Sequence, residues 1–307
     1  MKIDTGKITY HLIIILFSLV GRIPRNLAYQ MSNLIGTVGF RAAKKHRNIA
    51  INNLTRAFGN ELEPPEIEKL AQQVFKNLMY IIFEIGWSLK LNPKDVRKYF
   101  RVDGIANFIH ANKKGNGVLV LTAHMGNWEL LPVVGSLKNI PVNVLFRPLD
   151  FPALDQFFLK LRSRFGAVMI PTARSMRRIL RTLRRGEMIA ILMDQNVDWY
   201  EGVFVDFFGH RACTNKGMAL LALKTGAPVL PMFLIREDSG FKLKICPEIA
   251  PIKTGDKTKD VEANTAQYNR AIESIVREYP DQWFWVHQRW KTKPYHPWPK
   301  LRAGTPK

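Results

Sequence analysis

A histidine and a glutamate lie five positions apart, at His124 and Glu129, in the stretch GVLVLTAHMGNWEL. An imidazole can act as a general base when a carboxylate holds its other ring nitrogen and fixes the tautomer. On one continuous helix this separation would put the two side chains about 140° apart, too far around the helix to meet. We therefore expect His124 at the tip of a strand and Glu129 in the first turn of the next helix. The alternative is a capping glutamate beside a histidine that only satisfies the loop, although a strand tip favours catalysis.

The sequence shows no enzyme nucleophile to accompany this pair. It contains no GxSxG, Walker, HExxH or GxGxxG motif in a suitable context. The two cysteines, Cys213 and Cys246, lie outside any CxxC pair, so we expect reduced thiols, no metal site and no bound cofactor. A base without an enzyme nucleophile is typical of an enzyme that activates a hydroxyl of its substrate.

The segments around His124 predict an α/β fold with a mostly parallel sheet flanked by helices. GVLVLTAH is a continuous apolar run, as in buried parallel strands. Similar runs alternate with helical patterns, and chemistry in such folds gathers at the carboxyl ends of the strands. We expect further strands at 141–147, 167–171, 187–194, 227–236 and 241–249, and helices at 130–137, 152–166, 175–186, 214–226 and 260–280.

The first hundred residues predict a membrane-associated helical layer. An apolar segment from Ile8 to Gly21 would rise about 21 Å as a helix, which is short against a hydrocarbon core of roughly 30 Å. Basic residues follow it, so we favour a membrane anchor at 1–25 over a buried core helix. Residues 26–100 form the rest of this layer, with helices at 26–60 and 64–90 and a seam at 91–104. Residues 101–307 form the α/β domain, as one compact unit with the layer.

The net charge of +21, from 46 Lys and Arg against 25 Asp and Glu, predicts anionic partners. Nucleic acid is disfavoured because the positive charge is scattered over many elements and no nucleic-acid-binding motif appears. The stretch RSMRRILRTLRRGE puts Arg174, Arg177, Arg178, Arg181 and Arg185 on one helical face. This face is either a docking surface for an acidic protein or lipid phosphates, or a solvated charged face.

Blocks spread along the whole chain resemble one enzyme family. They include NLTRAFG, AHMGNWE, FRPLD, MDQN, FVDFFGHRACT, APVLPMFLIR and WFWVHQRWKTKP. This ordered set is similar to the late acyltransferases of lipid A biosynthesis, within the lysophospholipid acyltransferase superfamily, whose His-x-x-x-x-Asp/Glu motif His124 and Glu129 match. The resemblance implies transfer of a fatty acyl chain from acyl carrier protein to a hydroxyl of a lipid A precursor. It implies a bacterial inner membrane location with the active site facing the cytoplasm, next to anionic lipid.

By this resemblance His124 is the general base and Glu129 orients it. Another glycolipid, a lysophospholipid or an aminolipid remains an alternative acceptor. Arg147, at a strand end, and Arg164, late in a helix, are candidates for binding phosphate or the oxyanion, or else are surface arginines. Asp194 and Gln195 match the family's Asp-Gln block and are expected to shape the acceptor pocket, unless Asp194 is only an N-cap. Asn127 is expected to cap the helix that starts near Trp128 and to line the substrate site.

The carboxyl-terminal segment is rich in aromatic and basic residues. Trp283, Trp285 and Trp290, with Arg289 and Lys291, lie either at the level of lipid headgroups or in a segment that closes the core. His287 is expected to be a packed histidine, and the other histidines have no partners at useful spacing.

Overall fold

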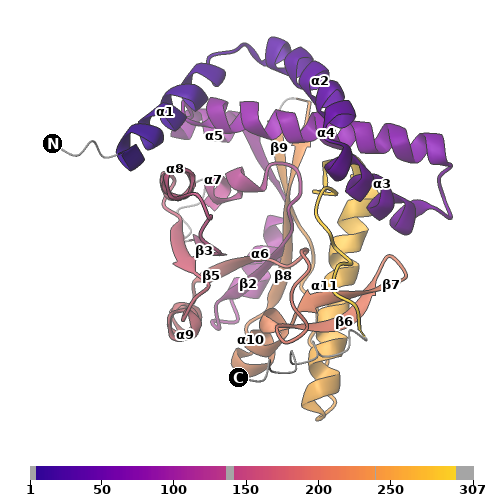
Figure 1. The fold of residues 1–307 in the computed structure, drawn as a ribbon. Helices are drawn as coiled ribbons and strands as arrows, with labels where there is room; N and C mark the ends of the chain where they lie inside the picture. The colour runs from indigo at the N-terminus through magenta and orange to yellow at the C-terminus, as the bar shows by residue number, and fades with distance from the viewer. Residues whose placement is uncertain (1–4, 136–141, 239, 295–307) are drawn as a thin grey trace, which may run out of the picture.

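A seven-stranded sheet forms the centre of the computed structural model, which describes residues 5–135, 142–238 and 240–294 (Figure 1). Every neighbouring pair of strands in it is parallel except β8 and β9. The predicted α/β fold with a mostly parallel sheet is therefore confirmed. In spatial order the strands are β1 (Phe100–Asp103), β9 (Gly240–Ile245), β8 (Val229–Glu237), β2 (Val118–Thr122), β5 (Met188–Leu192), β3 (Val142–Phe146) and β4 (Val168–Pro171).

Helices cover both faces of this sheet. Successive residues of a strand point to opposite faces, so Val118 and Val120 belong to one apolar core while Leu119 and Leu121 belong to the other. The first core includes residues of α6 (Ile105–Asn112) and α7 (Leu131–Gly135). The second includes residues of α9 (Met176–Arg184), α10 (Gly217–Thr225) and α11 (Lys257–Glu278). Burial on both sides explains why β2 is apolar throughout.

Four amino-terminal helices form the predicted helical layer, across the top of Figure 1. They are α1 (Thr5–Val20), α2 (Arg25–Ala42), α3 (Lys44–Phe58) and α4 (Pro64–Ser88), and α4 contacts the other three. Helix α4 begins where expected, with Pro64 at its first position and a capping box between Glu63 and Glu66. Helix α1 also packs on α8 (Pro152–Ser163), where the Phe17 and Phe157 rings stack at 4.7 Å.

Within the described residues, no single helix has the length and apolar composition to cross a membrane. Helices α1 and α2 pass such a test only as a pair, and they are bent by 112° at their junction. Leu12 and Leu16 in α1 and Leu34 in α2 point outward and are more than half exposed.

Several local predictions need correction. The predicted seam at 91–104 contains α5 (Pro93–Tyr99) and β1, and β1 pairs with β9 as part of the sheet. A hairpin of β6 (Gly202–Phe207) and β7 (His210–Asn215) was not predicted, and β7 takes the first two residues of the helix expected at 214–226. The helix expected at 130–137 comprises the short η1 (Trp128–Leu130) and α7, and residues 136 and 137 lie outside the described ranges.

The aromatic carboxyl-terminal segment closes the core. Trp283, Trp285 and Trp290 are buried, and Arg289 is fully buried among them. The alternative that placed these residues at lipid headgroups is therefore wrong for these four, whereas Lys291 is exposed.

Candidate active site

His124 follows the carboxyl end of β2, and Asp194 follows the neighbouring strand β5. The Nδ1 atom of His124 lies 2.8 Å from Oδ1 of Asp194, and the His124 main-chain N–H donates to Oδ2 at 2.9 Å. The indole Nε1 of Trp283 donates to the same Oδ2 at 2.7 Å. Burial of Asp194 opposes its ionisation, but the charge and N–H donors of His124 hold the pKa of Asp194 well below its usual range. Asp194 is therefore a carboxylate at neutral pH.

This carboxylate fixes the tautomer of His124. An ionised carboxylate only accepts hydrogen bonds, so in the neutral imidazole Nδ1 carries the proton and Nε2 has the lone pair. The side chain of His124 is 19% exposed, and Nε2 lies 3.5 Å from Nε2 of the exposed Gln195. Trp128 contacts the ring edge-on, at 5.0 Å between centroids. In its neutral form the ring thus presents the lone pair of Nε2 beside solvent, as a general base must.

Glu129 does not make the contact with His124 that was expected. Its carboxylate accepts two hydrogen bonds from Arg162 of α8, at 2.7 and 2.9 Å, and one from Nε1 of Trp128 at 3.0 Å. Asp194 occupies the place beside Nδ1 that was assigned to Glu129. Glu129 reaches His124 only through the Trp128 ring, and its role in catalysis stays a prediction.

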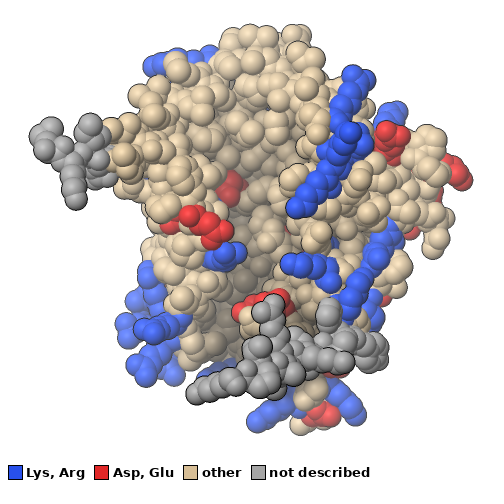
Figure 2. All heavy atoms as spheres, in the orientation of Figure 1, with Lys and Arg blue, Asp and Glu red and all other residues tan. Residues whose placement is uncertain are grey.

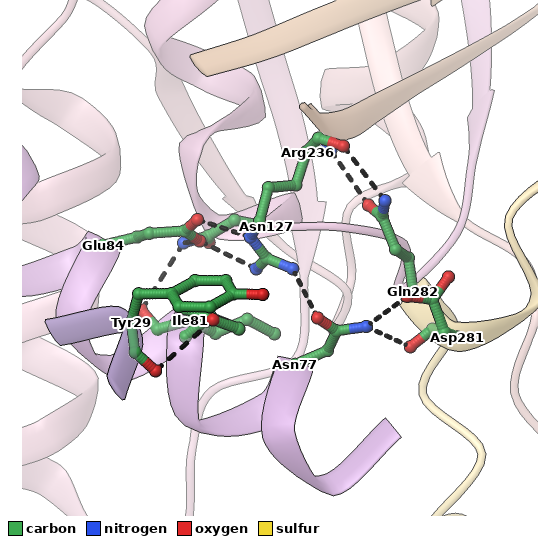
Figure 3. Close-up of polar contacts among 9 residues, drawn as sticks. Tyr29, Asn77, Ile81, Glu84, Asn127, Arg236, Asp281 and Gln282 are labelled. Carbon is green, nitrogen blue, oxygen red and sulfur yellow. Dashed lines mark hydrogen bonds and ion pairs between the residues drawn. The ribbon is translucent and has the colours of Figure 1, made fainter. Parts of the chain in front are cut away.

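Asn127 lies in the predicted loop but does not cap the following helix. Its side chain is fully buried and makes no cap hydrogen bond. Instead, its Nδ2 donates to Glu84 of α4 at 2.9 Å. Glu84 also pairs with Arg236 of β8, whose guanidinium donates to Asn77 (Figure 3). This buried network joins α4, β8 and the loop after His124.

The two predicted arginines have different surroundings. Arg147 follows the carboxyl end of β3, is 77% exposed at its side chain, and pairs with Asp150 at 3.0 Å. It remains a candidate for binding an anion. Arg164 instead donates to the main-chain oxygens of Ser88, Leu89 and Leu91, at the carboxyl end of α4. The expectation of an anion-binding Arg164 is therefore corrected, because its donors satisfy a helix end.

The carboxyl-terminal segment completes the site. Met125 forms a β-bridge with Trp283, and the main-chain N–H of Phe284 donates to the oxygen of His124 at 3.1 Å. Gly126 has a φ of +55°, and a Cβ there would lie 2.1 Å from the main-chain oxygen of Leu234. Only glycine fits this turn, which lets the chain reverse between His124 and Glu129.

We did not predict a role in the site for three residues that shape it: Arg162, Trp128 and Trp283. Arg162 lies two positions before the arginine that was considered, and its side chain is only 15% exposed. A partly buried arginine on an amphipathic helix gives no local signal of its carboxylate partner. Among the described residues, no three His, Cys, Asp or Glu side chains come together in a way that could hold a metal ion.

Comparison with known proteins decides the family. The sequence profile described as "Bacterial lipid A biosynthesis acyltransferase" matches residues 4–292. The chain belongs to this family. The lipid A biosynthesis palmitoleoyltransferase of Escherichia coli (strain K12) is 28% identical over 276 residues, which cover 89% of this chain and 88% of that protein. The lipid A biosynthesis lauroyltransferase of the same strain is 24% identical over 90% of this chain and 89% of its own length.

One relative of this chain is named for an acceptor other than lipid A. The phosphatidylinositol mannoside acyltransferase of Mycolicibacterium smegmatis (strain ATCC 700084 / mc(2)155) is 25% identical over 180 residues, 57% of each chain. The chain is thus an acyltransferase of the lipid A biosynthesis family, and the ordered blocks that suggested this are confirmed as a family resemblance.

Proposed function

We propose that this acyltransferase moves a fatty acyl chain from acyl carrier protein to a hydroxyl of a lipid A precursor, with His124 as the general base. The arrangement of His124 and Asp194 carries the proposal. Asp194 keeps the proton on Nδ1, so Nε2 is free to take a proton from an acceptor hydroxyl. Asp194 therefore acts as the positioning residue that we had expected Glu129 to be.

The proposed step balances without any cofactor. Nε2 of His124 removes the hydroxyl proton, and the oxygen attacks the thioester carbon. The new C–O bond forms a tetrahedral intermediate, its collapse breaks the C–S bond, and the thiolate recovers the proton from the imidazolium. Asp194 stabilises the imidazolium in between.

We assign a second, electrostatic role to Arg162. Two of its nitrogens bind Glu129, and Nη1 has no hydrogen bond to a described residue. A charged donor of this kind suits an oxyanion or a substrate phosphate. Glu129 would then position Arg162 and the Trp128 ring rather than His124 itself, and Gln195 would contact the acceptor near Nε2.

The acceptor is proposed to reach the site from a bacterial inner membrane, with the site on the cytoplasmic side. The outward apolar side chains of α1 and α2 support this, as does the net charge of +21 of the chain. Another glycolipid is the second candidate acceptor, because the mannoside acyltransferase relative matches over more than half of the chain.

The test is acyl transfer by the purified protein in detergent micelles, with product detected by mass spectrometry. The donor is acyl carrier protein thioester, offered with a lipid A precursor, a lysophospholipid or a phosphatidylinositol mannoside. We expect the lipid A precursor to be acylated fastest. His124→Ala should lower kcat by at least about 100-fold, and Asp194→Asn should also lower it strongly because the tautomer is no longer fixed.

His110→Ala is the matched control. His110 is exposed near the end of α6, and α6 leads into the amino end of β2. His110 therefore lies near the amino ends of the strands, whereas His124 lies at their carboxyl ends. It should keep wild-type activity. Full activity of both His124→Ala and Asp194→Asn would show that the proposed base is wrong.

A further inference from the structure

The exposed face of α9 carries arginines for which the proposed chemistry has no use. Ile179 and Leu183 bury the opposite face of the helix in the core. Only Arg185 forms an ion pair, with Glu187, and the other arginines of this face pair with no carboxylate among the described residues. We call the exposed set the α9 basic face: Arg174, Arg177, Arg178, Arg181, Arg184 and Arg185.

This face costs stability in the isolated protein. Arg177 and Arg181 are one turn apart, as are Arg181 and Arg185, and like charges at this spacing repel. No acidic residue lies in the first turn of α9, where the helix dipole favours negative charge. Arg174 has a φ of 54°, a conformation that residues other than glycine seldom adopt. An acidic partner would offset the repulsion and complement the dipole.

The α9 basic face begins at the carboxyl ends of the sheet strands, which is also where His124 lies. Pro171, the last residue of β4, pairs with Phe146 of β3, and Leu192 of β5 pairs with Thr122 of β2. Since Val144 pairs with Ala190, the ends of all four strands are level. Arg174 follows Pro171 by three residues. Three strand spacings, or roughly 14 Å, therefore separate β4 from the strand that carries His124.

The α9 basic face and the apolar helices α1 and α2 lie on different sides of the molecule. Figure 1 shows α1 and α2 at the top and α9 at the lower left, and in Figure 2 blue side chains gather at the position of α9. The broad area across the top, over α1 and α2, is mostly tan. A flat membrane against α1 and α2 would therefore not cover α9, which leaves its arginines to a partner in solution.

From these observations we infer that the α9 basic face docks the acidic carrier protein that brings the acyl thioester. The inference rests on the proposed function. An acyl thioester on a long flexible arm of the carrier protein can bridge the roughly 14 Å between β4 and β2. A lipid bound by its phosphate at α9 would instead hold its acceptor hydroxyl far from His124. Met176, the first residue of α9, is half exposed and offers an apolar contact beside the arginines.

Charge reversal on α9 tests this inference. In the variant R177E/R178E/R181E, the KM for acyl carrier protein thioester should rise at least tenfold, while kcat at saturating donor and the KM for the lipid acceptor stay near wild type. Transfer from an acyl-coenzyme A thioester, which has no acidic protein surface, should not change. Direct binding of carrier protein to the wild type should weaken as salt increases and should be lost in the variant.

The control variant K253E/K257E/K259E changes the net charge equally at exposed lysines before and in the first turn of α11, and it should bind carrier protein as the wild type does.

A wild-type KM for the carrier thioester in the α9 variant would overturn the inference. A rise in the KM for the lipid alone would overturn it too, in favour of a lipid phosphate site. If the wild type used acyl-coenzyme A but neither used nor bound carrier protein, the donor in the proposed function would also be wrong. If it used no thioester at all, the proposed reaction would fail, while the binding measurement would still decide the docking surface.

Discussion

Two buried ionisable side chains near the site differ in charge: Asp194 is ionised, whereas His287 is neutral. Asp194 stays charged because three N–H groups donate to its carboxylate. His287 donates from Nδ1 to the oxygen of Phe284 at 2.7 Å, but its Nε2 is shielded from solvent and has no partner. Burial lowers the pKa of His287 to about 4, although the nearby Asp194 acts in the other direction. His287 is thus the packed, neutral histidine that was predicted.

The buried neutral His287 predicts a loss of stability in mild acid. Its pKa is about 4 in the folded protein and about 6.5 in the unfolded chain, so the unfolded chain binds the extra proton between these values. The stabilising contribution is complete above pH 6.5 and is lost as the pH falls towards 4. From pH 7 to pH 5, the free energy of unfolding of the wild type should fall by up to about 2 kcal/mol more than that of His287→Phe.

Chemical denaturation in detergent at the two pH values measures this difference. His46→Phe, at an exposed histidine of α3, should keep the wild-type pH dependence. Equal pH dependence of the wild type and His287→Phe would rule out His287 as the cause.

At the scale of elements, one buried ion pair fixes α4 over the ends of the strands. Glu84 and Arg236 are only 12% and 13% exposed at their side chains. Burial disfavours the charged guanidinium, yet Glu84 raises the pKa of Arg236 above its usual value. Gln282 holds both main-chain groups of Arg236, and Asn127 donates to Glu84, so the pair also sets the loop after His124 (Figure 3).

Removal of one partner of this pair should strongly destabilise the protein. We expect Glu84→Leu to lower the free energy of unfolding by about 3–5 kcal/mol, because Arg236 would remain charged and buried. The double variant E84L/R236L should be clearly more stable than the sum of the two single changes predicts. A double-mutant cycle measured by denaturation gives both values.

The exposed pair of Lys114 and Glu248 serves as the comparison, with a side chain of Lys114 that is 42% exposed. Lys114→Ala should change stability by less than about 1 kcal/mol. A cost for Glu84→Leu as small as that for Lys114→Ala would contradict the structural role of the buried pair.

The molecule has an apolar surface on one side, formed by α1 and α2, and a strongly positive net charge. The outer faces of α1 and α2 expose large apolar side chains, which α4 and α8 do not cover. These side chains form a group rather than being scattered singly over the surface, and such an apolar surface suits contact with the interface of a membrane. The net charge of +21 would add attraction to anionic lipid.

Acidic substitutions on the outer face of α1 should release the protein from membranes. Leu12 and Leu16 are each 59% exposed, so L12D/L16D should leave the core intact. Burial of one leucine side chain contributes about 1.5–3 kcal/mol, so the partition onto vesicles that contain anionic lipid should fall at least about tenfold. Sedimentation with vesicles measures it. Leu220→Asp, at a leucine of α10 that is 46% exposed, should bind as the wild type does, and unchanged binding of L12D/L16D would exclude α1 as the membrane contact.

Most of the regular elements, including the strand that carries His124, could be predicted from the sequence alone. Apolar periodicity is a local property, so the runs around Val118–Thr122 and Met188–Leu192 were recognisable as buried strands, and their carboxyl ends as the place for His124 and Asp194. The hairpin β6–β7 was missed because its sequence alternates too little to indicate a strand pair.

The partners of the polar side chains in the site could not be predicted from the sequence, because they depend on the tertiary fold. Asp194 is 70 residues from His124, and Trp283 is 89 residues from Asp194, yet both contacts are direct hydrogen bonds. Likewise Arg162, 33 residues from Glu129, takes the carboxylate that local spacing assigned to His124. The spacing of two residues along the chain fixes which face each occupies, but the partner that a polar atom finds depends on which strands and helices become neighbours. That choice is made by the packing of the whole sheet, and no local period records it.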